Sequence, residues 1–249
     1  MIYRMPAVLA WLARTFPGIR LTISKWSAVN RATHCEVNDV LFHFDSRYMD
    51  RKRFVAIACG AIEDDEVYLA EKMITSEDIV VEFGAGLGIA ASRVHKKSLP
   101  KKHICYEANP LLEAYSHKLF SANSLNIELK NFGLGNGSAL DFYAQNDYIL
   151  SSYRKPDTHN DYRLISVPTV SFDQVLKEHQ PTAIFCDIEG AELNFITAES
   201  FGSVTKIIIE LHPYIYGVEG VASFTARMER HGFSLMQKQN DTYSFIRTV

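Results

Sequence analysis

The sequence lacks the features that mark several special classes of protein. None of its apolar runs approaches the ~20 residues that a membrane-spanning helix needs. It has four cysteines in 249 residues, and none forms a Cys-x-x-Cys pair, which argues against a zinc site. Its formal net charge of -3 argues against a broad nucleic-acid-binding surface. We also find no internal repeat, low-complexity tract or linker rich in proline and glycine.

The composition that remains is typical of a globular protein. Hydrophobic residues make up 47% of the chain and aromatic residues 12%, which is enough apolar surface for a buried core. Cys105 and Cys186 lie in apolar runs, so we expect both to be buried. Because the cysteine pattern favours a reducing compartment, we expect a cytoplasmic protein without stable insertion into a membrane. The sequence leaves the oligomeric state open.

We expect residues 1–65 to form an N-terminal extension of helix and strand, and residues 66–249 to form the main domain. Apolar residues at helical spacing predict a short helix over Met5–Phe16. Arg14 interrupts this run and no clear cleavage site follows, so we do not expect a signal peptide. Alternating apolar and polar residues predict two strands in the extension, Ile19–Trp26 and Val37–Phe44.

The rest of the chain alternates between short apolar runs and helical stretches. The run Phe54–Ile62 is compatible with strand or helix, and four acids suit the start of a helix over Glu63–Met73. Further strands are predicted at Ile79–Phe83, His103–Glu107, Ile127–Phe132, Ala183–Ile188 and Lys206–Leu211. Further helices are predicted at Ile89–Lys97, Pro110–Ser121, Ala191–Glu199 and Phe224–His231.

This alternation predicts an α/β protein with an open, mostly parallel Rossmann-like sheet and helices on both faces. Two departures are expected. Ala139–Tyr143 and Leu164–Val170 form extra strands around a polar loop at Gln145–Arg163. Residues 233–238 and 242–248 form an antiparallel hairpin at the C-terminus.

The sharpest motif is Val-Val-Glu-Phe-Gly-Ala-Gly-Leu-Gly, which ends at Gly88. An apolar strand here runs through three glycines at alternate positions into a helix, whose N-terminus offers free N–H groups to a ligand. Dinucleotide sites have G-x-G-x-x-G spacing, and the third glycine comes one residue early. The acid Glu82 would repel a pyrophosphate but attract a cationic amine. The motif therefore favours S-adenosylmethionine over a dinucleotide, with four loop residues at the cofactor: Gly84, Ala85, Gly86 and Gly88.

A second acid, Glu107, ends the next predicted strand, 23 residues after Gly84. That distance is close to the ~20 residues expected for an acid that binds ribose hydroxyls. We expect Glu107 and its neighbours Ala108 and Asn109 to contact the cofactor. Gly135, after the third strand, is expected to border the adenine.

The third signal is an acidic cluster where the fourth core strand enters a helix. Asp187, Glu189 and Glu192 fall within six residues, which exceeds what helix capping requires. Carboxylates in a cleft can hold an ammonium group, accept a proton or bind a divalent cation. His212, at the end of the fifth strand, is expected at the same edge of the sheet. We predict that these four residues are catalytic and that Asp187 also contacts the cofactor. A divalent metal is possible but not favoured.

Together these motifs resemble the FkbM family of S-adenosylmethionine-dependent methyltransferases, from about Glu66 to Ile209. The resemblance rests on the glycine loop, on Tyr-Glu-Ala-Asn-Pro at 106–110, and on Cys-Asp-Ile-Glu-Gly-Ala-Glu at 186–192 followed by Ile-Ile-Ile-Glu-Leu-His-Pro. The family usually has Asp where this chain has Glu82. The resemblance implies a class I methyltransferase fold and O-methylation of a saccharide or small natural product.

Two other functions remain open at this stage. One is a dinucleotide-dependent oxidoreductase, which the glycine spacing and Glu82 disfavour. The other is a non-catalytic protein that binds S-adenosylmethionine, since binding and turnover use the same residues. For the methyltransferase we expect a small-molecule or glycan acceptor and no nucleic-acid partner.

Overall fold

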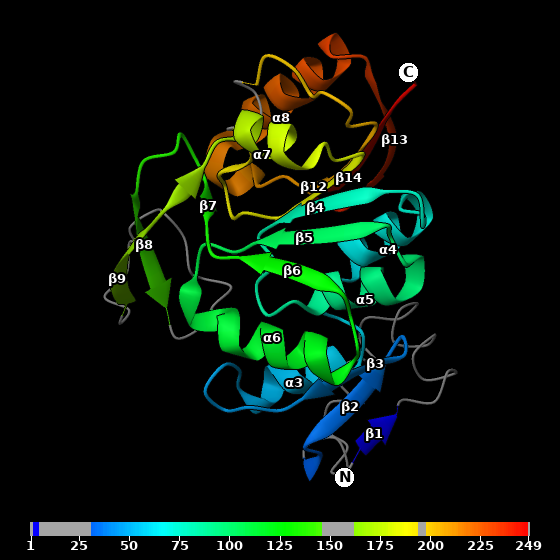
Figure 1. Ribbon diagram of the computed structural model, residues 1–249, viewed down its shortest axis with the longest axis vertical. Helices are drawn as coiled ribbons and strands as arrows, with labels where there is room; N and C mark the ends of the chain where they lie inside the picture. The colour runs from blue at the N-terminus through cyan, green and yellow to red at the C-terminus, as the bar shows by residue number, and fades with distance from the viewer. Residues whose placement is uncertain (1, 5–30, 146–161, 194–197, 249) are drawn as a thin grey trace.

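A seven-stranded sheet forms the centre of the molecule, in the order β13-β14-β12-β11-β4-β5-β6 (Figure 1). The computed structural model describes residues 2–4, 31–145, 162–193 and 198–248. Five strands of the sheet are parallel: β4 (Ile79–Phe83), β5 (Lys102–Tyr106), β6 (Ile127–Lys130), β11 (Ala183–Cys186) and β12 (Lys206–Glu210). The C-terminal hairpin, β13 (Phe233–Gln239) and β14 (Thr242–Arg247), pairs antiparallel with β12. The predicted Rossmann-like fold of class I methyltransferases and its C-terminal hairpin are therefore confirmed.

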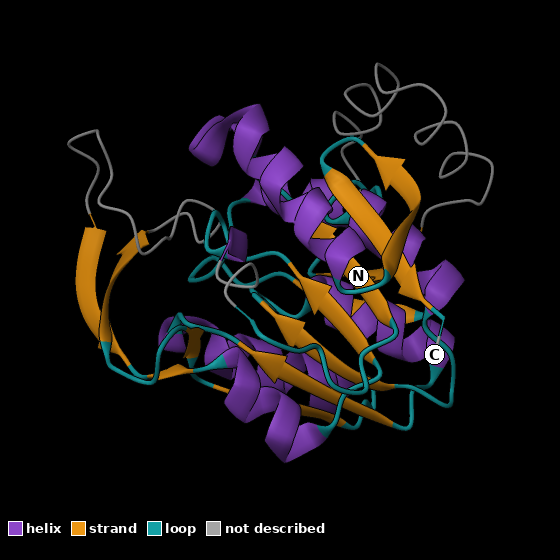
Figure 2. Ribbon diagram, turned by 90° about the horizontal axis from the view of Figure 1, so that it is seen from above, coloured by secondary structure: helices purple, strands orange, loops and turns teal. Residues whose placement is uncertain are grey.

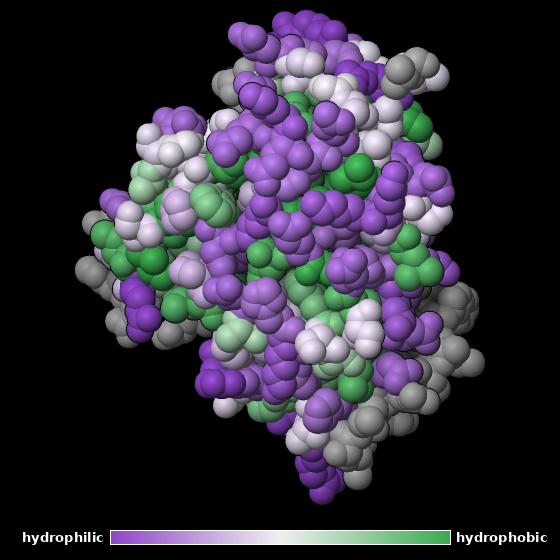
Figure 3. Space-filling view, in the orientation of Figure 1, coloured by the Kyte–Doolittle hydropathy of each residue, from purple (hydrophilic) through white to green (hydrophobic). Residues whose placement is uncertain are grey.

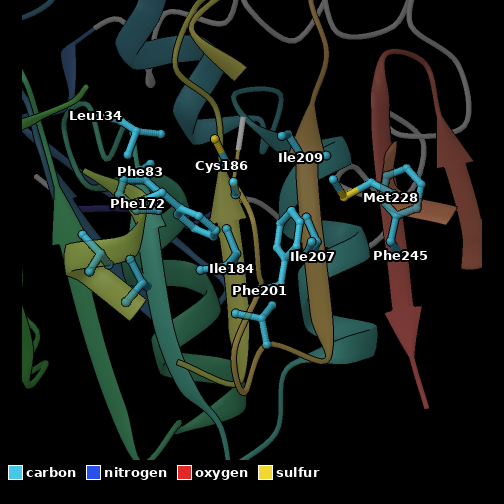
Figure 4. Packing of buried hydrophobic residues seen from close by; sticks show 14 of the residues in the cluster. Phe83, Leu134, Phe172, Ile184, Cys186, Phe201, Ile207, Ile209, Met228 and Phe245 are labelled. Atoms are coloured by element: carbon cyan, nitrogen blue, oxygen red, sulfur yellow. The ribbon is translucent and has the colours of Figure 1, made fainter. Parts of the chain in front are cut away.

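Helices cover both faces of this sheet because its strands are apolar on both sides. Val80, Phe185 and Ile208 pack with α4 (Asp64–Met73) and α5 (Ile89–Ser98). Ile184 and Ile207, which precede Phe185 and Ile208 in their strands, point to the other face and pack with α7 (Phe172–His179) and α8 (Pro213–Arg230) (Figure 4). The 3-10 turn η2 (Pro110–Leu112) and α6 (Glu113–Ala122) follow β5. Because β4, β5, β11 and β12 are parallel, their carboxyl ends lie at one edge of the sheet.

The N-terminal part differs in detail from the prediction. A small sheet contains β1 (Ile2–Arg4), β2 (His34–Val37) and β3 (Val40–His43). The strand predicted over Val37–Phe44 is present as β3 but begins only at Val40, because Asn38 and Asp39 have positive φ angles and form a turn between β2 and β3. The ambiguous run at Phe54–Ile62 falls mainly in a helix, α3 (Arg51–Ala58). The helix predicted at Met5–Phe16 and the strand at Ile19–Trp26 lie outside the described residues.

Three helical segments differ from the prediction. Helix α8 begins at Pro213, well before the predicted Phe224, and is interrupted at Gly217 (φ 72°, ψ 170°). Helix α7 was not predicted, although Ser171 caps it by accepting a hydrogen bond from the Gln174 N–H. Residues 194–197 of the helix predicted over Ala191–Glu199 lie outside the described residues. Of the others, Glu192 and Leu193 have 3-10 helical conformation, and Ala191, Ala198 and Glu199 are not helical.

Two short strand pairs complete the described structure. β7 (Gly133–Leu134) pairs with β10 (Thr169–Val170), and β8 (Leu140–Gln145) pairs with β9 (Tyr162–Val167). The β8–β9 pair forms an arm that extends away from the central sheet (Figure 2). Most of the predicted polar loop between them lies outside the described residues.

The four cysteines are all buried and free, as expected for Cys105 and Cys186. Hydrophilic residues cover most of the face in Figure 3, where apolar residues form small separate patches. Among the helices that the structure describes, none combines the length and apolar character of a membrane span.

Candidate active site

A cavity of about 450 Å³ lies at the carboxyl edge of the central sheet. Residues that follow four different strands line it: Gly84 after β4, Glu107 after β5, Asp187 after β11 and His212 after β12. The structure therefore brings together the three separate signals of the sequence. Segments outside the sheet close the cavity, including residues 61–63 before α4 and Phe142 of the β8–β9 arm.

The glycine loop forms one wall of the cavity. Gly84 has a φ of 85°, and a Cβ atom there would lie 1.6 Å from the backbone oxygen of Asp187, so only glycine fits. Gly86 also lines the cavity. Ala85 and Gly88 do not line it. Gly88 instead caps α5, with a φ of 76° and the Phe120 ring where a Cβ would be.

Glu107 lies on the adjacent wall and holds the glycine loop. One carboxylate oxygen accepts a hydrogen bond from the Gly86 N–H at 2.6 Å, and the other accepts from the Asn109 N–H at 2.7 Å. Burial raises the pKa of Glu107, and these two hydrogen bonds oppose that shift. Each oxygen has a second lone pair, so the carboxylate still has acceptor capacity for a ligand. Ala108 and Asn109 line the cavity beside it.

Besides Ala85 and Gly88, two further predicted cofactor residues, Glu82 and Gly135, do not line this cavity. Glu82 is buried behind the loop, where its carboxylate is 3.0 Å from Nε2 of His103. Burial raises the pKa of Glu82 to about 8 and lowers that of His103 to about 3. The expectation that Glu82 faces the ligand is therefore not met. Gly135 borders a neighbouring cavity of about 750 Å³, whereas Gly133, two residues earlier, lines the main one.

His212 stands at the centre of the acidic cluster. Its Nδ1 is 2.9 Å from Oε1 of Glu192, a fully buried carboxylate that also accepts a hydrogen bond from the Gly190 N–H. Its Nε2 is 3.6 Å from Oδ1 of Asp187 and 3.5 Å from Oε2 of Glu189. His212, Asp187 and Glu189 line the cavity, but Glu192 does not. The four predicted catalytic residues thus form one cluster, in which three face the cavity and Glu192 lies behind His212.

The carboxylates and the imidazole of this cluster shift one another's pKa values. Burial raises the pKa of Asp187 and of Glu189, and the negative charge of the second raises the first further. Burial alone would lower the pKa of His212, but the surrounding carboxylates, Glu192 first, outweigh it and raise that pKa. A cation placed in the cavity would favour the ionised carboxylates. The electrostatics therefore suit a positively charged ligand.

Sequence reasoning missed several acids of the cavity wall. Glu63 and Glu66 precede and begin α4 and were interpreted only as acids at a helix start, yet both line the cavity. Glu210, the last residue of β12, lines it as well, and burial raises its pKa. The sequence carries no signal that places these acids in the cavity wall, because their placement depends on how α4 packs over the sheet.

Three groups of described side chains could hold a metal ion, because their ligand atoms lie within 4.8 Å of one another. Two groups share Asp187 at the cavity: one adds Glu192 and His212, and the other adds Glu66 and Glu210. The third is buried in the core and consists of Glu82, His103 and Cys105.

The chain is similar to several solved structures of methyltransferases. A comparison with curated protein sequences gave no match. Among solved structures, the chain is similar to a methyltransferase from Pyrococcus furiosus (12% identity, 92% of this chain and 96% of that chain, TM-score 0.46). It is also similar to M. jannaschii TYW2 in complex with AdoMet (13% identity, 88% of each chain, TM-score 0.44). A third similar structure is the ribosomal protein L11 methylase from Lactobacillus delbrueckii subsp. bulgaricus (12% identity, 74% of this chain and 78% of that chain, TM-score 0.45).

The family model described as "Methyltransferase FkbM domain" matches residues 82–235, more than half of the chain. The matched segment contains the glycine loop, Glu107, the acidic cluster and His212. The chain therefore belongs to the FkbM methyltransferase family.

Proposed function

We propose that this protein binds S-adenosylmethionine in the main cavity and methylates a hydroxyl group of a saccharide or small natural product. One observation carries the proposal: the glycine loop, Glu107 and the cluster around His212 line a single cavity. Cofactor binding and proton acceptance can therefore occur side by side. The acceptor would be a small molecule or glycan rather than a nucleic acid, and we propose that the protein acts in the cytoplasm.

The residues of the cavity fit this cofactor. Gly84 and Gly86 leave the backbone of the loop open to a ligand. Glu107 has acceptor capacity for two ribose hydroxyls, and Asp187 offers a carboxylate to the amino group. S-adenosylmethionine, when bound, supplies an electrophilic methyl group on a sulfonium ion, whose sulfur keeps the electron pair of the broken bond.

The chain's own part in the reaction is to hold the acceptor and remove its proton. The acceptor oxygen forms the new bond to the methyl carbon, and its proton passes to the group formed by His212, Asp187 and Glu189. Because these three residues shift one another's pKa values, we assign the proton to the group rather than to one atom. Glu192 lies behind His212 and takes no direct part.

Calorimetry and a transfer assay test the proposal. The protein should bind S-adenosylmethionine but not NAD, and Gly86→Val should abolish that binding because its side chain occupies ligand space. Binding of NAD alone would indicate the oxidoreductase instead. Asp187→Asn and Glu189→Gln should lower methyl transfer, by roughly 100-fold for a general base. The exposed acid Glu199 provides the control, Glu199→Gln, which should keep wild-type transfer.

Two further outcomes would contradict the proposal. Cofactor binding without transfer to any hydroxyl compound would indicate a non-catalytic binding protein. Full transfer activity in both acid variants, and in Glu192→Gln, would remove the cluster from the reaction. We expect transfer to persist in the presence of a chelator, because a metal is not favoured.

A further inference from the structure

Tyr214 is a large aromatic residue that lines the cavity and yet is 74% exposed. Its hydroxyl donates a hydrogen bond to Oε2 of Glu189 at 3.2 Å. Its ring meets the His212 ring edge to face, with 5.4 Å between centroids and 79° between planes. The side chain is therefore held on two sides by the proposed catalytic group, while most of its surface faces solvent.

The backbone around Tyr214 is fixed as well. The helical turn at residues 213–216 ends at the break at Gly217. Within it, the Tyr216 hydroxyl accepts a hydrogen bond from the His212 N–H at 2.5 Å. Ile215 packs so closely on Gly190 that a Cβ at Gly190 would lie 2.6 Å from its Cδ1 atom. The turn is thus anchored to both segments that carry the acidic cluster, which presets the position of the ring.

The charge of the cavity restricts what can bind next to this ring. The described wall carries six carboxyl groups: Glu63, Glu66, Glu107, Asp187, Glu189 and Glu210. Within the described residues, His212 is the sole basic side chain of that wall. Burial raises the pKa of all six groups, and a bound cation favours their ionised forms. The ionised carboxylates accept hydrogen bonds from neighbouring hydroxyls and repel a phosphate or a carboxylate.

We propose that Tyr214 is the platform on which an uncharged saccharide ring stacks, with its reacting hydroxyl toward His212. The inference rests on the proposed function and makes it more specific. The C–H face of a sugar ring is apolar and fits an exposed aromatic face, while the ring hydroxyls find acceptors in Glu189 and Glu210. Sugar phosphates and uronic acids are excluded by the carboxyl groups of the wall.

Two measurements test this platform. Saturation-transfer NMR in the presence of S-adenosylhomocysteine measures saccharide binding without turnover. The panel pairs neutral sugars (glucose, galactose, mannose and their oligosaccharides) with glucose 6-phosphate and glucuronate. The second measurement is the KM for the best acceptor in Tyr214→Ala, Tyr214→Phe and Val218→Ala. Val218 is 77% exposed on the same helix but does not line the cavity, so it is the matched control.

We expect neutral sugars to bind and the two anionic sugars not to bind. Tyr214→Ala should raise KM about tenfold and leave cofactor affinity unchanged, since ring contacts of this kind contribute about one factor of ten. Tyr214→Phe keeps the ring but loses the hydrogen bond to Glu189, so its KM should rise far less than that of Tyr214→Ala while its kcat falls. Val218→Ala should match the wild type in both KM and kcat. An unchanged KM in Tyr214→Ala, or preferred binding of an anionic sugar, would overturn the inference. Methyl transfer only to hydroxyl compounds that are not sugars would also overturn it, but would leave cofactor-dependent methylation intact. If the wild-type protein does not bind S-adenosylmethionine, the proposed function itself is refuted.

Discussion

Oε1 of Glu192 lies 2.9 Å from Nδ1 of His212, on the side of the imidazole that faces away from Asp187 and Glu189. Glu192 is fully buried and does not line the cavity, so it cannot touch a substrate there. A carboxylate in this position fixes which ring nitrogen carries the proton and directs Nε2 to the cavity. Glu192 is therefore a positioning residue for His212.

Glu192→Gln should lower methyl transfer by roughly 100-fold while cofactor affinity stays the same, because only the orientation and basicity of His212 change. The carboxylate of Glu192 raises the pKa of His212. Removing its charge lowers that pKa, so the acid limb of the rate profile should move to lower pH. The measurement is kcat against pH for both proteins.

The control for this experiment is Glu199→Gln, which changes an exposed acid of the same segment. Its rate profile should coincide with that of the wild type. A purely structural role of Glu192 predicts a lower rate at every pH with no shift of the limb, and that result would contradict the assignment.

Gly84→Ala should destabilise the fold rather than act on the ligand alone. A Cβ would lie 1.6 Å from the Asp187 backbone oxygen, and a φ of 85° is strained for any L side chain. We expect a thermal midpoint many degrees lower or no soluble protein. Gly137→Ala, at another positive φ but in open space, is the matched control for strain without the clash. Equal midpoints for the two variants would show that the backbone contact can relax.

Much of the fold could be predicted because its signals are local. Short runs such as Ile207–Ile209 are apolar at every position, which is typical of a strand covered on both faces. The glycine loop follows β4 and Glu107 follows β5, so the topology itself brings them to one edge. Family membership then rested on motifs that lie at those ends.

The features that were missed depend on tertiary packing. In the sequence, Glu63 and Glu66 look like ordinary acids at the start of a helix. They line the cavity only because of the way α4 packs on the sheet. Glu82 lies at the right point of its motif, but the alternation of side chains along β4 aims it at His103. Tyr214 belongs to a helical turn whose start at Pro213 was not recognised. No periodicity in the sequence reports these orientations.

Glu107→Ala should lower cofactor affinity by one to two orders of magnitude and also loosen the glycine loop. The carboxylate binds the backbone N–H groups of Gly86 and Asn109, so its loss leaves two buried donors without partners. Glu107→Gln keeps one acceptor oxygen and should show a smaller loss of both affinity and stability. Calorimetry with S-adenosylmethionine and thermal unfolding without it separate the two effects. Equal affinity in Glu107→Ala and wild type would remove this acid from the site.

Asp78 should make stability depend on pH in acid solution. Burial alone would raise its pKa, but Lys206 at 2.6 Å, the Thr75 N–H and hydroxyl, and the Thr182 hydroxyl outweigh burial and lower it. Because the folded pKa is below the unfolded one, this stabilisation is complete above the unfolded pKa, near 4, and is lost as pH falls through the folded value.

Asp78→Asn should therefore lower the free energy of unfolding at pH 7 by roughly 1.5–3 kcal/mol, the range for losing hydrogen bonds to a charged group, because Lys206 is partly exposed. The difference from wild type should shrink steadily as the pH falls below 4, where the native carboxyl is protonated too. Urea unfolding at pH 7 and at pH 3 measures both values, with the adjacent exposed acid in Glu77→Gln as the control. A difference of the same size at the two pH values would mean that the threonine contacts, not the charge, carry the stabilisation.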